Sequence, residues 1–258
     1  MLLQSHLSFR PVFLRARFDA GRASGQIEAM PPLKPSISIA EARALQEQMR
    51  GQVIRTGAPQ DVRYVAGVDC GFPGEHEGKV TRAAVVVLRY PELELHEQSV
   101  IERPTDFPYV PGFLSFREAP AVLEALGRLK TTPDLLIVDG HGYAHPRGFG
   151  IACHLGVASG LPSIGAGKSR LVGEYRMPAE KAGSSEPLLY KGETVGTVLR
   201  TRDGVAPLFV SCGHKIGLDA AVQWVSACTR GYRLPETTRW ADGLAGDPGF
   251  RLKSRHKR

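Results

Sequence analysis

The feature that most constrains the fold is the apolar run LLIV at 135–138, which is followed at once by Asp139 and Gly140. A half-exposed strand alternates apolar and polar side chains, so a strand that is apolar at every position must be covered on both faces. The segment PSIGAG at 162–167 has the same buried character, and a helical pattern at 148–160 separates the two. Two buried strands joined by a helix predict a β-α-β crossover inside an α/β fold.

The segments before this core predict a helix and a meander. Residues 36–54 read as a helix after the first two residues, because the letters SIAE fit the capping box S-x-x-E. Strand patterns follow at 63–72, 81–91 and 93–104, and the short Pro-Glu turn between the last two predicts antiparallel pairing.

The rest of the chain completes a recognisable order of elements. The patterns predict a helix at 114–130, a surface loop at 178–188 and strands at 192–201 and 208–216. They predict a last helix at 218–229. An antiparallel meander followed by parallel strands, with helices flanking the sheet, is typical of the ribonuclease H-like fold. We therefore predict an α/β protein with a mixed sheet of this kind.

Composition excludes several classes of protein. The chain has 258 residues, of which 42% are hydrophobic and 23% charged, as in ordinary globular proteins. Its 4 cysteines include no C-x-x-C pair, which argues against a disulfide framework or a zinc ribbon and favours a reducing, cytoplasmic location. No apolar run approaches the length of a membrane span. We expect a monomer without membrane contact.

The net charge of +7 is carried by the two ends of the chain. Residues 251–258 contribute +5 and residues 1–30 contribute +2, so residues 31–250 sum to zero. A basic tail can bind phosphate backbones or can simply be solvated. We expect 1–30 to be an extension, or to precede a true start at Met30, with 31–250 as a single domain.

Two aspartates stand where acids are costly. Asp69 interrupts an apolar strand pattern, and Asp139 ends another. Buried acids require a partner, a hydrogen bond or a metal. Two of them on neighbouring strands could share a cation such as Mg²⁺ or Mn²⁺, although each could instead cap a turn.

Three further polar residues carry weaker signals. Ser115 and Glu118 fit a capping box, with Pro120 in the first turn of a helix that begins near Ala119. That pattern favours a capping role for Glu118 over a metal role. Lys168 ends a predicted strand, where it can neutralise a phosphate as a point charge.

A proline-braced loop precedes the 114–130 helix. The letters PYVPG at 108–112 place an aromatic and a β-branched residue between two prolines, which fix the backbone. Such a stiff apolar tip suits a wedge between stacked bases. An ordinary surface turn is the alternative reading.

Taken together, these segments resemble the endonuclease V family. The similarity lies in six blocks in the order of the family, YVAGVDCGF, PYVPGFLSFREAP, VDGHGYAHPRGFGIACHLG, LPSIGAGKSRL, APLFVSCGH and YRLPETTRWAD. The resemblance implies a ribonuclease H-like fold and a nuclease dependent on Mg²⁺, for which Mn²⁺ can substitute. It implies repair of DNA at deoxyinosine, with hydrolysis of the second phosphodiester bond on the 3′ side.

The same resemblance assigns residue roles. It implies Asp69, Asp139 and Glu118 as metal ligands, and Lys168 and His214 as further catalytic residues. It implies a wedge made of Pro108, Tyr109, Val110 and Pro111. It implies a base pocket made of Gly112, Leu114, Gly140 and Gly142. We also expect phosphate contacts from His145 and Arg147.

Two alternatives stay open, and the chain departs from the family pattern at Gly71, at Ala166-Gly167 before Lys168 and at Cys212. An enzyme of this family could act mainly on inosine-containing RNA, and a catalytically silent inosine-binding module is a third reading. The presence of all five catalytic residues at the positions of the family's active site argues against silence. Gly71 stands two residues after Asp69, where the family often has serine.

Overall fold

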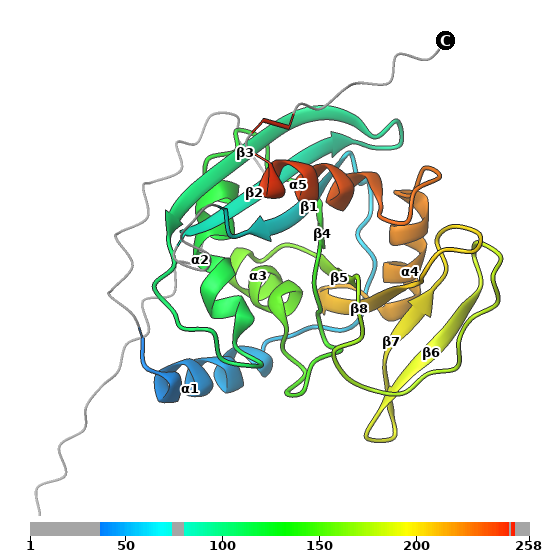
Figure 1. The fold of residues 1–258 in the computed structure, drawn as a ribbon, viewed down its shortest axis with the longest axis horizontal. Coiled ribbons are helices and arrows are strands. Elements are labelled where there is room, and N and C mark those ends of the chain that lie inside the picture. Colours follow the sequence, from blue (N-terminus) through cyan, green and yellow to red (C-terminus); the bar gives the residue numbers. More distant parts are fainter. Residues whose placement is uncertain (1–36, 74–79, 248, 251–258) are drawn as a thin grey trace, which may run out of the picture.

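One mixed sheet of eight strands organises the described part of the chain (Figure 1). The computed structural model describes residues 37–73, 80–247 and 249–250, so the expected extension at 1–30 and the basic tail at 251–258 lie outside the described residues. The strands are β1 (Tyr64–Gly71), β2 (Val80–Arg89), β3 (Glu94–Pro104), β4 (Leu135–Val138), β5 (Ser163–Gly167), β6 (Ser185–Tyr190), β7 (Glu193–Leu199) and β8 (Leu208–His214). The helices are α1 (Ile39–Arg50), α2 (Leu114–Gly127), α3 (Ile151–Ser159), α4 (Leu218–Ala227) and α5 (Glu236–Gly246).

The strand order is β3-β2-β1-β4-β5-β8-β7-β6. Strands β1, β2 and β3 form the predicted antiparallel meander, while β4 runs parallel to β1 and β5 parallel to β4. Strands β8 and β7 continue the sheet in antiparallel pairing. The predicted fold class is therefore confirmed, because the meander and the crossovers occupy the expected places.

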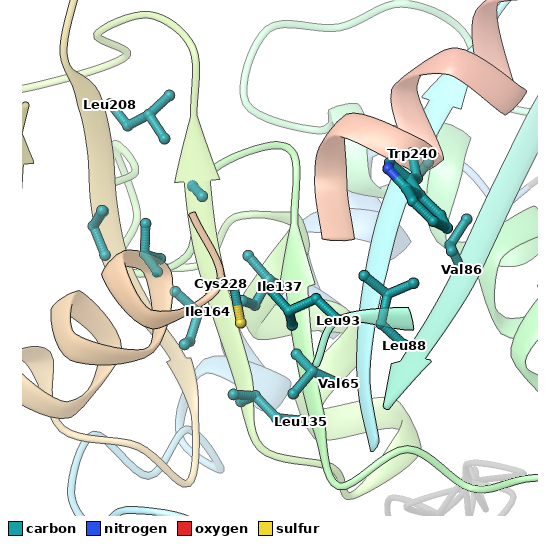
Figure 2. Close-up of a cluster of buried hydrophobic side chains, with 14 of the residues drawn as sticks. Val65, Val86, Leu88, Leu93, Leu135, Ile137, Ile164, Leu208, Cys228 and Trp240 are labelled. Carbon is teal, nitrogen blue, oxygen red and sulfur yellow. The ribbon is translucent and has the colours of Figure 1, made fainter. Parts of the chain in front are cut away.

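Each face of the sheet is covered by its own helices. Val65, Leu135, Ile137 and Ile164 point to one face, where they pack with Trp240 of α5 in a large cluster (Figure 2). Their sequence neighbours point to the other face and pack against α2 and α3. The continuous apolar run of β4 exists because its alternate residues supply both cores.

Helix α5 lies unusually close to β1. A Cβ atom on Gly67 would lie 1.9 Å from the carbonyl oxygen of Thr237, and one on Gly71 would lie 2.5 Å from that of Ala245. These two glycines let the helix backbone rest on the strand.

Three sequence predictions are corrected by the structure. The stretch at 178–188 is not simply a loop, since it includes the first residues of the edge strand β6. Residues 218–229 do not form the last helix, because α5 follows α4. Helix α2 begins at Leu114, so Pro120 lies inside it and not in its first turn.

The capping box predicted for α2 is also wrong, whereas the one predicted for α1 is confirmed. In α1 the Ser38 side chain accepts from the Glu41 amide and the Glu41 carboxylate accepts from the Ser38 amide. The N-cap of α2 is Phe113, which offers no side-chain cap. Ser115 instead shares a hydrogen bond of 3.1 Å with His154, which ties α2 to α3.

All four cysteines are free, and three of them are buried. Within the described ranges, none of the helices is both long enough and apolar enough to cross a bilayer.

Candidate active site

Three aspartates meet beside β1, β4 and α5. Side-chain oxygens of Asp69, Asp139 and Asp242 lie within 4.8 Å of one another. Asp69 lies on β1, Asp139 follows the last residue of β4, and Asp242 lies on α5. Alternation along β1 and β4 turns both strand aspartates to the face that α5 covers. The Gly67 contact then brings Asp242 down to them.

Lys168 closes this cluster from the end of β5. Its Nζ lies 2.6 Å from Asp139 Oδ2, and it also pairs with Asp242 Oδ1. Arg233 fixes the lysine backbone, because its Nη2 donates to the Lys168 carbonyl and, at 3.0 Å, to that of Pro207. Burial alone would lower the pKa of Lys168, but the hydrogen bonds to Asp139 and Asp242 outweigh it and raise the pKa.

The cluster is short of positive charge. Burial raises the pKa of Asp69 to about 8, and the Asp139 carboxylate adds to the shift. Burial also raises the pKa of Asp139, against the opposing effect of Lys168. Three carboxylates against one ammonium, in a partly buried place, favour binding of a cation. Carboxylate oxygens suit a hard divalent ion, so the residues fit a divalent metal site.

Glu118 approaches from the other face of the sheet. It lies on α2, is buried, and stands outside the group of three whose oxygens meet. Burial raises the pKa of Glu118 to about 8, and the charge of Asp139 adds to the shift while Arg117 opposes it. Glu118 is therefore near enough to Asp139 to interact electrostatically, but it does not complete the aspartate cluster.

The structure does not bring His214 to the cluster. His214 pairs with Ser163, the first residue of β5, whereas Lys168 follows the last residue of that strand. Five residues of extended chain separate the two ends, which is about 16 Å. The His214 ring is committed elsewhere, because its Nδ1 accepts from the Ile54 amide at 3.3 Å.

The loop expected to form the wedge projects from the molecule. Tyr109 is 71% exposed. Phe107, Phe113 and Phe116 pack beneath the loop. The Arg117 guanidinium lies 5.8 Å from the Tyr109 ring and 4.9 Å from the Phe72 ring. An exposed aromatic on a packed base is the arrangement a wedge requires.

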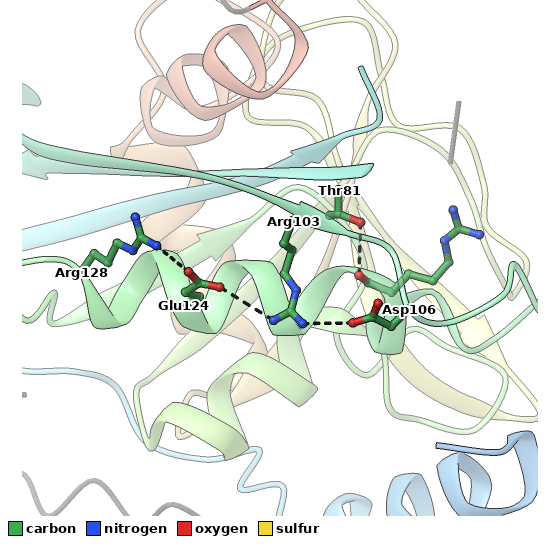
Figure 3. A network of polar contacts seen from close by, with 6 residues as sticks. Thr81, Arg103, Asp106, Glu124 and Arg128 are labelled. Atoms are coloured by element: carbon green, nitrogen blue, oxygen red, sulfur yellow. Dashed lines mark hydrogen bonds and ion pairs between the residues drawn. The ribbon is translucent and has the colours of Figure 1, made fainter. Parts of the chain in front are cut away.

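A polar network anchors the segment that leads into this loop. Arg103 contacts Asp106 at 3.1 Å and Glu124 of α2 at 3.8 Å, and Glu124 also pairs with Arg128 (Figure 3). Thr81 and Thr105 share a hydrogen bond of 2.8 Å. Each half-exposed pair contributes little by itself. Together they attach the end of β3 to α2 immediately before the loop.

Of the four expected pocket residues, Gly112 is fixed by hydrogen bonds to its backbone. Its φ of +79° requires glycine. Its carbonyl accepts from Gln46 Nε2 at 3.1 Å and from Arg147 Nη2. His145, which is buried, is hydrogen-bonded to the same backbone, and burial lowers the pKa of its ring to about 4. His145 and Arg147 thus brace the loop, and their expected phosphate contacts stay a prediction.

The other three expected pocket residues differ in whether their backbone polar atoms are already hydrogen-bonded within the protein. Gly142 donates to Ser211 Oγ at 2.9 Å and accepts from the Gly150 amide at 2.9 Å, so its polar atoms are already used. Gly140 lies between Asp139 and this turn, with φ +156°. Leu114 is 42% exposed at the uncapped start of α2. The first amides of a helix have no acceptor in a preceding turn; here the Phe116 amide donates to the Phe113 carbonyl at 3.0 Å, which leaves the amides of Leu114 and Ser115 as donors.

Sequence reasoning missed Asp242 and Gln46. Asp242 went unassigned because α5 itself was not predicted, although Trp240, Ala241, Leu244 and Ala245 show its apolar stripe after Pro235. Gln46 is 1% exposed, although it lies on α1, where most side chains are exposed to solvent. A lone glutamine in a sequence carries no signal of burial, so only the structure could reveal its contact with Gly112.

Comparison with known proteins decides the family. The Endonuclease V family model matches residues 47–243. This chain belongs to the endonuclease V family. Its sequence is 56% identical over 209 residues to an endonuclease V of Nostoc punctiforme, covering 81% of this chain and 94% of that protein. It is therefore a nuclease, a hydrolase of the deoxyribonuclease V class.

Solved structures of endonuclease V agree with the fold. The enzyme of Streptomyces avermitilis superposes with a TM-score of 0.78 at 45% identity, covering 83% of this chain and 94% of that one. An endonuclease V of Ciona intestinalis, in complex with a 24mer DNA containing an inosine followed by a ribo-adenosine, has a TM-score of 0.68 at 28% identity. That alignment covers 80% of this chain and 95% of the Ciona chain.

The raised pKa of Asp69 predicts how stability depends on pH when metal is absent. The pKa is about 8 in the folded protein and 3.8 in the reference state, so between these values the unfolded chain binds fewer protons. Stability therefore falls as pH rises from about 4 to about 8, by up to about 1.4 kcal/mol per pH unit for one group. In EDTA, Asp69→Asn is expected to melt several degrees above the wild-type protein at pH 8, and nearer to it at pH 5.

Thermal unfolding followed by circular dichroism at both pH values measures this difference. Glu92→Gln, at an exposed position, is the matched control and should leave the profile unchanged. An Asp69→Asn protein no more stable than wild type at pH 8 would contradict the proposed burial of charge.

The position of His214 predicts a small effect on catalysis. His214→Ala removes the hydrogen bond to Ile54, which costs about 1 kcal/mol of stability, but it leaves the cleavage rate close to that of wild type. Initial rates on an inosine-containing duplex, measured well below the melting temperature, test this. A loss comparable to that caused by removing a cluster aspartate would show that His214 reaches the reaction centre.

Proposed function

We propose that this chain is a DNA repair endonuclease that recognises deoxyinosine, the product of adenine deamination, and hydrolyses the second phosphodiester bond on its 3′ side. The observation that carries the proposal is the cluster of Asp69, Asp139 and Asp242 with Lys168, in a chain of this family. The complex of the Ciona relative with inosine-containing DNA supports the choice of lesion. We propose 31–250 as the catalytic domain, acting as a monomer.

The proposed cofactor is Mg²⁺, with Mn²⁺ as a substitute. Held by Asp69, Asp139 and Asp242, it would supply Lewis-acid stabilisation of the charge that develops on the phosphate and the leaving oxygen. Oxygen ligands alone favour these ions over zinc. The free cysteines are consistent with the reducing cytoplasm as its place of action.

Lys168 and Glu118 have complementary roles in this proposal. The two aspartates hold the Lys168 ammonium at the cluster, where it can offset negative charge on the phosphate in the transition state. Glu118, with a pKa of about 8, can exchange a proton near neutral pH and so orient or deprotonate the attacking water.

Recognition is proposed to combine the wedge with the uncapped start of α2. Tyr109 would occupy the space left in the stack when the lesion is flipped out, at a cost of a few kcal/mol that mispairing reduces. Hypoxanthine carries an acceptor at O6, where adenine carries a donor. Free amides at the start of α2, beside Leu114, would favour the acceptor, and Gly112 and Gly142 would shape the pocket.

A comparison of four matched strands tests this function. DNA and RNA oligonucleotides of the same sequence, each with inosine or adenosine at one position, are incubated with Mg²⁺. We expect cleavage of the inosine strands only, with DNA cut faster. Faster cutting of RNA would favour the alternative, an inosine-specific ribonuclease, and equal cutting of adenosine strands would contradict both.

A further inference from the structure

A second hollow lies outside the aspartate cluster. It has a volume of about 210 Å³ and lies between the end of α1, the 143–148 loop and the turn that joins β6 to β7. Its lining includes Arg50, Tyr143, Arg147, Tyr190 and Lys191. In Figure 1 the β6–β7 turn and α1 lie on the same lower side of the molecule. We call this hollow the basic groove.

The basic groove has an excess of positive charge. Among the described residues, the ion pairs include none with Arg50, Arg147 or Lys191. The acid in the lining, Glu193, is already paired with Arg55 at 2.7 Å and accepts from the Tyr143 hydroxyl at 3.3 Å.

The neighbours of Arg147 do not change this balance. Its guanidinium binds the neutral Gln46 side chain and the Gly112 carbonyl. Burial lowers the pKa of Arg147, and of its charged neighbours on α1, Arg43 lowers that pKa while Glu47 raises it. Within the described ranges, the three cations around this hollow therefore form no ion pair, although residues 31–250 as a whole carry no net charge.

Lys191 occupies a strained position. Lys191 and Gly192 connect β6 to β7, with φ values of +53° and +79°. A two-residue turn with positive φ at both positions favours Asn-Gly, and a residue with a Cβ there costs about 1 kcal/mol. The Lys191 Nζ lies 5.2 Å from the Tyr190 ring, at the edge of the groove. A lysine held in a strained turn is consistent with use of its charge.

We propose that the basic groove binds the phosphodiester backbone of the substrate strand outside the reaction centre. The inference rests on the proposed function, because the segment that begins at Asp139 and shapes the base pocket continues directly into the groove at Tyr143. Cations beside aromatic rings are the usual lining of a channel for a nucleic-acid strand. DNA and RNA share this backbone, so the groove adds affinity without reading sequence.

Binding measured against salt concentration tests the groove. Full-length wild type, Arg50→Ala/Lys191→Ala and the control Arg63→Ala/Lys130→Ala are titrated in EDTA with fluorescent duplexes and RNA strands, with and without inosine. The control removes the same charges at exposed positions at the start of β1 and beyond the end of α2. The groove variant is expected to bind about tenfold more weakly near 0.15 M salt, with a salt slope lower by about 2.

The same measurement separates the possible outcomes. An equal loss on inosine and adenosine strands supports the groove even if the preference for inosine fails, so the two proposals are judged separately. An unchanged affinity and slope for the groove variant overturns the proposal. An equal loss in the control variant also overturns it, because the effect would then come from overall charge.

A single substitution distinguishes function from folding. Lys191→Asn creates the Asn-Gly turn that this backbone favours, so it is expected to raise the melting temperature while weakening nucleic-acid binding. Weaker binding by a more stable protein cannot come from unfolding. Binding equal to that of wild type would contradict a role for the lysine.

Discussion

Asp139→Asn is expected to reduce cleavage of an inosine-containing duplex by about 10³-fold, because the stabilisation that a metal gives to the transition state is worth several kcal/mol. Asp139 contacts Lys168 directly, contributes an oxygen to the aspartate cluster and is 8% exposed. Asparagine keeps its size and removes its charge. The substitution therefore removes a ligand for the cation and a partner of the lysine without opening a cavity.

Binding should survive this change. The wedge loop, the start of α2 and the basic groove do not depend on the Asp139 charge, so affinity for the duplex in EDTA should stay close to that of wild type. Single-turnover cleavage and equilibrium binding measure the two effects separately. Asp219→Asn, at an exposed position on α4, is the matched control. A cleavage rate within tenfold of wild type would exclude Asp139 from the metal site.

Gly67→Ala is expected to lower the free energy of unfolding by at least about 3 kcal/mol, at the upper end of what overpacking costs. The new methyl group would lie 1.9 Å from the Thr237 carbonyl oxygen, and backbone atoms cannot move aside as a flexible side chain can. The strand and α5 must separate. Because β1 carries Asp69 and α5 carries Asp242, the same displacement should also abolish cleavage.

Urea unfolding and initial rates measure both effects. Gly127→Ala is the control, since a Cβ at that position meets nothing within 4 Å and the residue ends α2. That substitution should be neutral or slightly stabilising. A Gly67→Ala protein with wild-type stability would show that α5 does not rest on β1 as described.

The sequence carried most of the information about the sheet, because apolar continuity and alternation are local patterns. The four apolar residues of β4 predict a strand that is covered on both faces. The three strand patterns before it, two of them joined by a short turn, predict the meander. β6 escaped prediction because it is a largely exposed edge strand containing a proline, and such strands lack an apolar signature. α5 escaped because glycine and threonines weaken its helical pattern.

The residues of the site were harder to predict from the sequence than the fold was. Asp69 and Asp139 could be chosen because an acid in an apolar strand is costly, which is a property of the local sequence. Asp242 lies on a polar helical surface where acids are common, and it joins the cluster only through the approach permitted by Gly67. His214 illustrates the opposite case, because its motif suggested the reaction centre while the register of β8 on β5 places it at the other end of the strand.

The position of the cut is the most direct test of the central proposal. A duplex with one deoxyinosine, labelled at the 5′ end of that strand, is incubated with Mg²⁺ and, separately, with EDTA. We predict a single nick one nucleotide beyond the inosine's own 3′ linkage, which requires Mg²⁺ and is absent from the adenine duplex. Cleavage in EDTA, equal nicking of the undamaged duplex, or no nick on any inosine strand would contradict a metal-dependent endonuclease directed to inosine.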